Sequence, residues 1–124
     1  MGAPLAEAEL RLSSDPHFGG DAASLNPEQL LVAAASSCQL LEFLALAARA
    51  RVEVLSYDDD AEGVMDDAGR PARIERIVLR PRIRVATGTS EERVLKLVDQ
   101  GHRLCYVANS LSTEISVEPT VTLR

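Results

Sequence analysis

The sequence contains few aromatic residues and no motif for binding a metal or a nucleotide. It has no Trp, 2 Tyr and 2 Phe among 124 residues, and its formal net charge is -6 at pH 7. An acidic chain without aromatic residues between its basic ones does not fit nucleic acid or an anionic membrane surface as a partner. The sequence also has no CxxC or HExxH pattern, no glycine-rich phosphate loop and no serine-centred nucleophile elbow. We therefore expect neither a metal nor an organic cofactor.

The N-terminal residues lack the apolar stretch of a secretory signal, and the chain has few cysteines. Without an export signal we expect a cytoplasmic protein. A length of 124 residues fits a single domain, residues 1–124. Cys38 and Cys105 are the only cysteines. In such a chain, two cysteines are more often free thiols or a redox pair than a structural bridge.

The main feature of the sequence is an apolar stretch that begins at Asn26 and ends near Arg51. Asn26 suits a helix cap, Pro27 suits the first helical position, and Gln29 completes a capping-box pattern. No Gly or Pro interrupts residues 30–48, which are rich in Ala and Leu. The length of the stretch alone would also fit a membrane span, but its polar residues and flanking arginines favour a soluble protein. A helix so apolar needs cover on nearly every side, so we expect a second subunit to supply part of it.

The remaining segments predict a mixture of strands and one further helix. Strands are expected at residues 9–13, 52–57, 73–85 and 114–123, with a hairpin turn near Gly69. Thr89 and Glu92 form a capping-box pattern ahead of a second helix that ends near Val107. Cys105 lies on or beside the apolar stripe of this helix. The order predicts an α+β fold with an antiparallel sheet and both helices on one of its faces.

Four arginines alternate along the strand expected at residues 73–85. Arg76, Arg80, Arg82 and Arg84 fall on one side, and the apolar residues fall on the other. Such a row could bind phosphate groups, but an acidic chain without interleaved aromatic residues favours a solvated sheet face. Pro81 lacks a backbone donor and favours an edge strand or a bulge here.

Cys38 and Cys105 are the candidate chemical groups. They are 105 − 38 = 67 residues apart, so they meet only if the two helices pack together. A buried cysteine is also commonly a small core residue, and this alternative stays open at this point. His102 is three residues before Cys105 and shares its helix face, where a structural role is the simpler interpretation. A thiol between the helices would become a nucleophile if a neighbour favoured its thiolate.

The residues around both cysteines resemble a known family. The segment FGGDAASLNPEQLLVAAASSC before Cys38 and the segment HRLCYVANS around Cys105 are similar to the OsmC/Ohr family of thiol-dependent peroxidases. The stretch at residues 15–21 is similar to the DPxFxGD motif of the OsmC-like branch. The resemblance extends from about Leu10 to the C-terminus. It implies an α+β fold with a long buried central helix, formed by two intertwined subunits with active sites at their boundary.

The resemblance also implies a reaction and its residues. Cys38 matches the peroxidatic cysteine, Cys105 the resolving cysteine, and Glu28 the glutamate that holds a catalytic arginine. In the family that arginine comes from an N-terminal strand or its following loop, upstream of the segment that matches Leu10 to Ser13. We expect the given sequence to begin too late to include it, and Arg11 does not match its position. The implied reaction reduces organic hydroperoxides or hydrogen peroxide through a Cys38 sulfenic acid and a Cys38–Cys105 disulfide. The implied reductant is an external dithiol or a lipoylated protein.

Helix geometry adds a constraint on Glu28. It precedes Cys38 by 38 − 28 = 10 residues, and ten residues of straight helix rise about 15 Å. A carboxylate and a thiol so far apart do not share a site within one straight helix, so we expect the Glu28 of one subunit to serve the Cys38 of the other. Two alternatives to the enzyme remain at this point: a non-catalytic dimeric binder of a small hydrophobic molecule, and a redox sensor.

Overall fold

The computed structural model describes residues 6–66, 68–69 and 71–124. The contacts divide the chain into two compact units, Met1–Leu31 and Val32–Arg124, and each is described by itself. The expectation of a single domain stays a prediction.

The first unit contains a short helical turn and the beginning of the long helix. The 3-10 helix η1 (Pro16–Phe18) is capped by Asp15, whose carboxylate accepts a hydrogen bond from the backbone N–H of His17. The strand predicted at residues 9–13 is wrong, because this segment forms an isolated parallel bridge between Leu12 and Leu25 instead of a strand. Leu10 and Leu12 are 39% and 38% exposed, so this segment has no buried apolar face to hold it in a sheet.

The predicted capping box at the start of α1 (Pro27–Arg49) is confirmed. The backbone N–H of Gln29 donates to Asn26 Oδ1 at 2.8 Å, and the backbone N–H of Asn26 donates to Gln29 Oε1 at 3.0 Å. The helix ends in a Schellman motif, with Val52 N bonded to Ala47 O and Arg51 N bonded to Ala48 O. Arg51 occupies the left-handed position, with φ of 58°.

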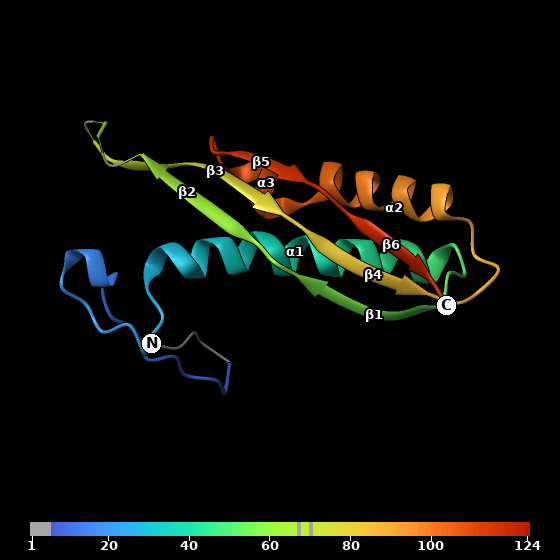
Figure 1. The fold of residues 1–124 in the computed structure, drawn as a ribbon, viewed down its shortest axis with the longest axis horizontal. Coiled ribbons are helices and arrows are strands. Elements are labelled where there is room, and N and C mark those ends of the chain that lie inside the picture. The colour runs from blue at the N-terminus through green and yellow to red at the C-terminus, as the bar shows by residue number, and fades with distance from the viewer. Residues whose placement is uncertain (1–5, 67, 70) are drawn as a thin grey trace. The chain divides into compact units, whose positions relative to one another are not determined.

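In the second unit, three long stretches of chain each form two strands. They are β1 (Val54–Asp59) with β2 (Glu62–Asp66), β3 (Arg73–Leu79) with β4 (Pro81–Val85), and β5 (Glu114–Val117) with β6 (Thr120–Leu123). The strands form two three-stranded sheets, in the orders β1-β4-β6 and β2-β3-β5, and Figure 1 shows the long stretches running side by side. The single strands predicted at 73–85 and 114–123 are each divided into two. The first is divided just before Pro81 and the second at Pro119, because proline donates no ladder hydrogen bond.

The α+β class is confirmed, but the sheets are not antiparallel throughout. The pairs β1–β4 and β2–β3 are antiparallel, whereas β3–β5 and β4–β6 are parallel. The parallel pairs follow from the long connection at residues 86–113, which holds α2 (Glu91–Leu104) and α3 (Tyr106–Ser110). This connection carries the chain back to the end of the sheets at which β3 begins. The stretch of β5 and β6 therefore runs in the same direction as that of β3 and β4.

Both helices pack on one face of the β1-β4-β6 sheet, as the sequence predicts. Pro81, Ile83 and Val85 of β4 are buried, whereas Arg82 and Arg84 between them are exposed. The core that this face covers joins residues of α1, α2 and β4 with Val52 of the segment between α1 and β1. Its members are Phe43, Ala47, Val52, Ile83, Val85, Val94, Leu97 and Val98.

The second helix begins and ends differently from the prediction. Ser90, not Thr89, caps α2, and its hydroxyl accepts a hydrogen bond from Arg93 N. The helix stops at Leu104 rather than continuing to Val107, because Cys105 adopts an extended conformation (φ −63°, ψ 113°) before α3 begins. This interruption places Cys105 at the junction of two helices.

Candidate functional site

Cys38 lies in the middle of α1, beside the line of residues that the helix buries. That line is Ala35, Gln39, Phe43 and Ala47, and its spacing of four residues defines one helix face. Cys38 is next to Gln39 in the sequence and is half-buried. Its thiol is therefore part of a rigid helix and keeps partial access from outside.

Cys105 is held much more deeply. It is 2% exposed, although its neighbours Leu104 and Tyr106 are 50% and 76% exposed. Its backbone N–H donates to His102 O at 3.3 Å at the end of α2. Its Sγ accepts a hydrogen bond from Ala108 N at 3.5 Å and so caps the first turn of α3.

The structure brings the two thiols close together. Both cysteines are free thiols, and Cys38 is close enough to Cys105 to act on the pKa of its thiol. Burial raises the pKa of the Cys105 thiol, and the neighbouring Cys38 raises it further. Backbone N–H groups of Ala108 and Val107 lower it and offset part of this rise. The surroundings of Cys105 therefore favour its protonated thiol.

Close packing of α1 against α2 makes this approach possible. A Cβ atom on Gly101 would lie 3.3 Å from Phe43 N and 3.3 Å from Gln39 Nε2, so glycine allows the helix backbones to approach. Gln39 is fully buried, and its Nε2 donates to Val98 O at 3.1 Å. This buried bond connects the turn of α1 that carries Cys38 to α2. Gln39 was not predicted to belong to the site, although a glutamine within an apolar helix is a signal that could have indicated it.

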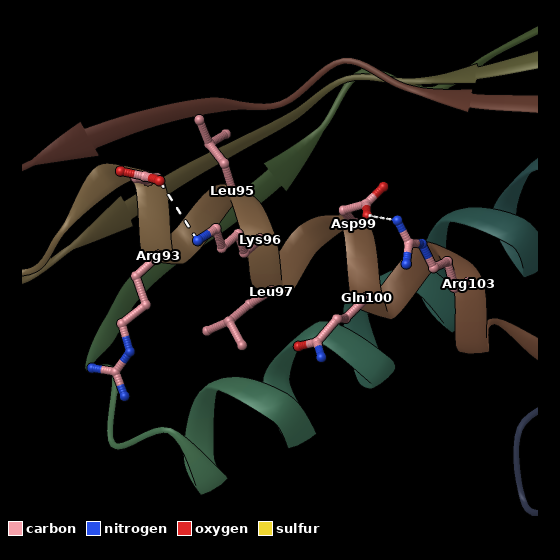
Figure 2. Close-up of a pocket in the computed structure, with 8 residues that line it drawn as sticks. Arg93, Leu95, Lys96, Leu97, Asp99, Gln100 and Arg103 are labelled. Carbon is pink, nitrogen blue, oxygen red and sulfur yellow. Dashed lines mark ion pairs between the residues drawn. The ribbon is translucent and has the colours of Figure 1, made fainter.

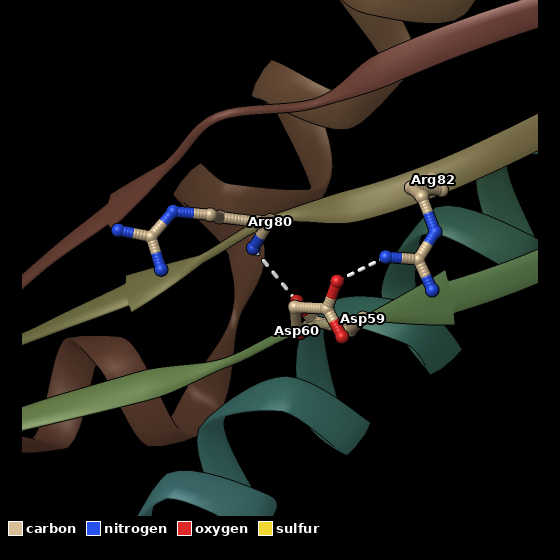
Figure 3. Close-up of polar contacts among 4 residues, drawn as sticks. All are labelled: Asp59, Asp60, Arg80 and Arg82. Carbon is tan, nitrogen blue, oxygen red and sulfur yellow. Dashed lines mark hydrogen bonds and ion pairs between the residues drawn. The ribbon is translucent and has the colours of Figure 1, made fainter.

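Asp59, the last residue of β1, connects α1 with the break between β3 and β4. Its carboxylate accepts the Ser36 hydroxyl at 2.5 Å and the Arg80 backbone N–H at 2.7 Å, as Figure 3 shows for Arg80. Arg82 pairs with Asp60, and Arg80 pairs with Glu118 at 3.3 Å. These arginines thus lie on an exposed face with acidic partners beside them, which supports a solvated face rather than a phosphate site.

The third predicted residue, Glu28, belongs to the first unit. It is half-buried in the first turn of α1, where a carboxylate interacts favourably with the helix dipole. Arg11, also in the first unit, is exposed. The roles predicted for Glu28, Cys38 and Cys105 stay predictions.

Neither the hollow beside α2 nor the acidic and histidine side chains of the described residues form a second site. A shallow hollow of about 620 Å³ runs along α2 and is lined by that helix alone, including Leu95, Leu97 and Gln100. Along the helix, Lys96 pairs with Glu92 and Arg103 pairs with Asp99 (Figure 2). Its lining includes neither cysteine, and no group of three or more His, Cys, Asp or Glu suited to a metal occurs among the described residues.

The side of α1 opposite its buried line is apolar and exposed. Leu41 is 66% exposed and Leu44 is 37% exposed. By length and composition α1 would be able to cross a membrane, and 22% of its apolar window is buried. The same test is passed by core helices of soluble proteins. Cover was expected on nearly every side of α1. Within the described residues, other parts of the chain cover one side of this helix.

Comparisons with known proteins agree with this architecture. The family model described as OsmC-like protein matches residues 19–120. An OsmC-like protein of unknown function from Vibrio cholerae is 34% identical, with a TM-score of 0.78, over 86% of this chain and 74% of that one. No curated protein matches the sequence.

Two more distant structures share the fold. An organic hydroperoxide resistance protein from Elizabethkingia anophelis is 21% identical, with a TM-score of 0.71, over 97% of this chain and 83% of that one. An organic hydroperoxide resistance protein OsmC from Legionella pneumophila is 19% identical, with a TM-score of 0.69, over 94% and 82% of the two chains. The family match over residues 19–120 and the 34% identity to the Vibrio cholerae protein show that the chain belongs to the OsmC-like family.

Proposed function

We propose that this protein is a thiol-dependent peroxidase that reduces organic hydroperoxides or hydrogen peroxide. The observation that carries the proposal is a pair of neighbouring free thiols, one half-buried on α1 and one almost fully buried. A second thiol within reach is what a sulfenic acid needs for conversion to a disulfide. Membership of a family that includes organic hydroperoxide resistance proteins supports the same reaction.

The reaction has two chemical steps at the protein. The Cys38 thiolate attacks one peroxide oxygen, the O–O bond breaks, and the alkoxide leaves and takes a proton from water to become the alcohol. Cys38 is then a sulfenic acid. The Cys105 thiol attacks this sulfur, an S–S bond forms, and the hydroxyl of the sulfenic acid leaves with the Cys105 proton as water. An external dithiol, free or on a lipoylated protein, regenerates both thiols by exchange.

The difference in burial supports these assignments. Cys38 is half-buried, whereas Cys105 is 2% exposed, so a peroxide reaches Cys38 more readily than Cys105. A resolving thiol needs no access of its own, because its target is already beside it. Apolar neighbours on the same helices suit the organic part of a hydroperoxide.

Steady-state peroxide consumption with dithiothreitol or dihydrolipoamide tests the proposal. Cys38→Ser should abolish turnover, and Ser37→Ala should retain it, because Ser37 is the exposed neighbour whose hydroxyl bonds only to Ala34 O. Wild-type protein that consumes no peroxide would contradict the proposal. Thermal stabilisation of such inactive protein by small apolar molecules would instead favour a binding function.

We also propose that two copies associate through the exposed side of α1. The apolar residues on this side include Ala33, Leu41, Leu44, Ala45 and Ala48. A patch of this kind is typical of an association surface. Leu41→Glu should convert a dimer into a monomer in sedimentation velocity, and an unchanged sedimentation coefficient would contradict the proposed surface.

The dimer would let Glu28 of one subunit serve Cys38 of the other. Mixed refolding of Glu28→Gln and Cys38→Ser proteins tests this arrangement. If the site is shared, heterodimers contain one intact pair and recover part of the activity. If the mixture stays as inactive as its components, Glu28 has no role across the boundary.

A further inference from the structure

Gln39 is the one polar member of the line of residues that α1 buries. The other three members are Ala35, Phe43 and Ala47. Gln39 is 0% exposed, and its Nε2 donates to Val98 O at 3.1 Å. Its Oε1 has no hydrogen-bond partner among the described residues. A buried acceptor without a partner lowers stability, so packing alone does not account for this amide.

The hydrogen bond that Gln39 does make adds little to stability. Val98 lies inside α2, where its carbonyl oxygen also accepts the backbone N–H of the residue one turn later. The bond from Nε2 is therefore a second bond to an oxygen that already has a partner. An apolar side chain of the same length would leave no unpaired group on either helix. Buried polar groups of this kind are kept in some helical assemblies because they fix how the helices align.

The alignment of α1 along α2 depends on Gln39, because the other contacts on this line are smooth or face elsewhere. The two alanines of the line carry only a methyl group, and Gly101 on α2 carries no side chain. The ring of Phe43 packs against Tyr57 of β1, with ring centroids 5.7 Å apart. A hydrogen bond to one carbonyl keeps its length within about 0.5 Å. The equivalent carbonyl of the next turn of α2 lies about 5.4 Å away, so this bond specifies a single alignment.

We propose that Gln39 is a positioning residue that holds Cys38 in register with Cys105. Cys38 directly precedes Gln39 in α1. Cys105, the C-cap of α2, follows Val98 by 105 − 98 = 7 residues, which is two turns and returns to nearly the same helix face. A disulfide needs its two Cβ atoms about 3.5–4.5 Å apart, so a small slip of α1 along α2 would prevent the bond. The inference rests on the disulfide of the proposed function and adds the residue that sets its geometry.

Replacement of Gln39 by an apolar side chain of similar length separates positioning from stability. Gln39→Met removes the amide, and Leu40→Met is the matched control at the half-buried neighbouring residue. The equilibrium between dithiol and disulfide is measured in glutathione redox buffers. The urea midpoint is measured on the reduced proteins at one protein concentration.

We expect Gln39→Met to lower the equilibrium constant for Cys38–Cys105 disulfide formation about three- to tenfold, the equivalent of one hydrogen bond. The urea midpoint should be unchanged or higher, because the unpaired Oε1 is removed at the same time. Leu40→Met should leave the equilibrium constant unchanged. Gln39→Leu, which removes the same amide with a branched side chain, should repeat the result of Gln39→Met.

A purely structural role of Gln39 predicts that the midpoint and the equilibrium constant fall together, and this result would overturn the proposal. An equilibrium constant equal to that of the wild-type protein would also overturn it, as would failure of both Gln39 variants to fold. These measurements use no peroxide. If wild-type protein forms the disulfide but consumes no peroxide, the proposed function fails, and a weaker disulfide in Gln39→Met still supports the positioning role. If wild-type protein forms no disulfide in glutathione, both proposals are wrong.

Discussion

A bond between Cys38 and Cys105 should stabilise the folded protein, because it closes a long loop. The cysteines are 105 − 38 = 67 residues apart. The loop-closure entropy of a segment of this length corresponds to about 4 kcal/mol at 25 °C. The bond also takes the Cys105 sulfur out of its role as the cap of α3, and losing a cap costs about 1 kcal/mol. The expected net gain in unfolding free energy is therefore about 3 kcal/mol.

Urea unfolding of the fully reduced and the fully oxidised protein measures this gain. Both samples need the same protein concentration, since association would also raise the midpoint. By linkage, folding should shift the exchange equilibrium with glutathione toward the protein disulfide by about a hundredfold relative to the unfolded chain. Cys105→Ser treated with the same oxidant is the control and should not change.

The refuting result is an oxidised protein that is no more stable than the reduced one. It would mean that forming the bond distorts the packing of α1 on α2, and that the two thiols are not positioned to react. A gain well above the loop-closure value would instead point to contacts that only the oxidised protein makes.

Three further substitutions test the packing and the ionisation around the site. Arg51→Gly should raise the unfolding free energy by about 1 kcal/mol in urea titrations, because φ of 58° suits glycine; no gain would contradict strain at this position. Gly101→Ala should destabilise the fold by about 1–3 kcal/mol and slow disulfide formation, since its Cβ would lie 3.3 Å from Phe43 N; unchanged stability would mean that the helices separate easily. Burial, and then Asp59, raise the pKa of Tyr57 above its usual 10.0, so the stability that neutral Tyr57 contributes is complete below pH 10.0 and is lost as the pH rises beyond it. Tyr57→Phe should remove this alkaline loss in thermal melts, and identical melting profiles would contradict the assignment.

Local signals in the sequence were sufficient for much of the helical structure. Asn26, Pro27 and Gln29 predicted the start of α1, because capping is determined by adjacent residues. Alternation along β4 predicted its buried and exposed faces correctly. The predicted cap of α2, Thr89, was wrong by one residue, since Ser90 is the cap. Both residue types have a hydroxyl that suits this position.

Features that depend on distant contacts could not be predicted in the same way. The parallel pairing of β5 and β6 depends on where the helical connection returns the chain, and no residue in either strand specifies this. The break at Cys105 was missed because the apolar spacing of α2 continues through it. The proximity of the two thiols depends on the close approach at Gly101 and on the buried amide of Gln39, which become meaningful only once the helices are packed.

Peroxide reduction by Cys38 and Cys105 is tested most simply by mass spectrometry of a single turnover. Fully reduced protein is mixed with one equivalent of cumene hydroperoxide, quenched with iodoacetamide and digested. We predict an intramolecular Cys38–Cys105 disulfide formed together with one equivalent of alcohol, and a stable sulfenic acid on Cys38 when Cys105 is replaced by serine. Recovery of both cysteines as alkylated thiols, with the peroxide unconsumed, would contradict the account.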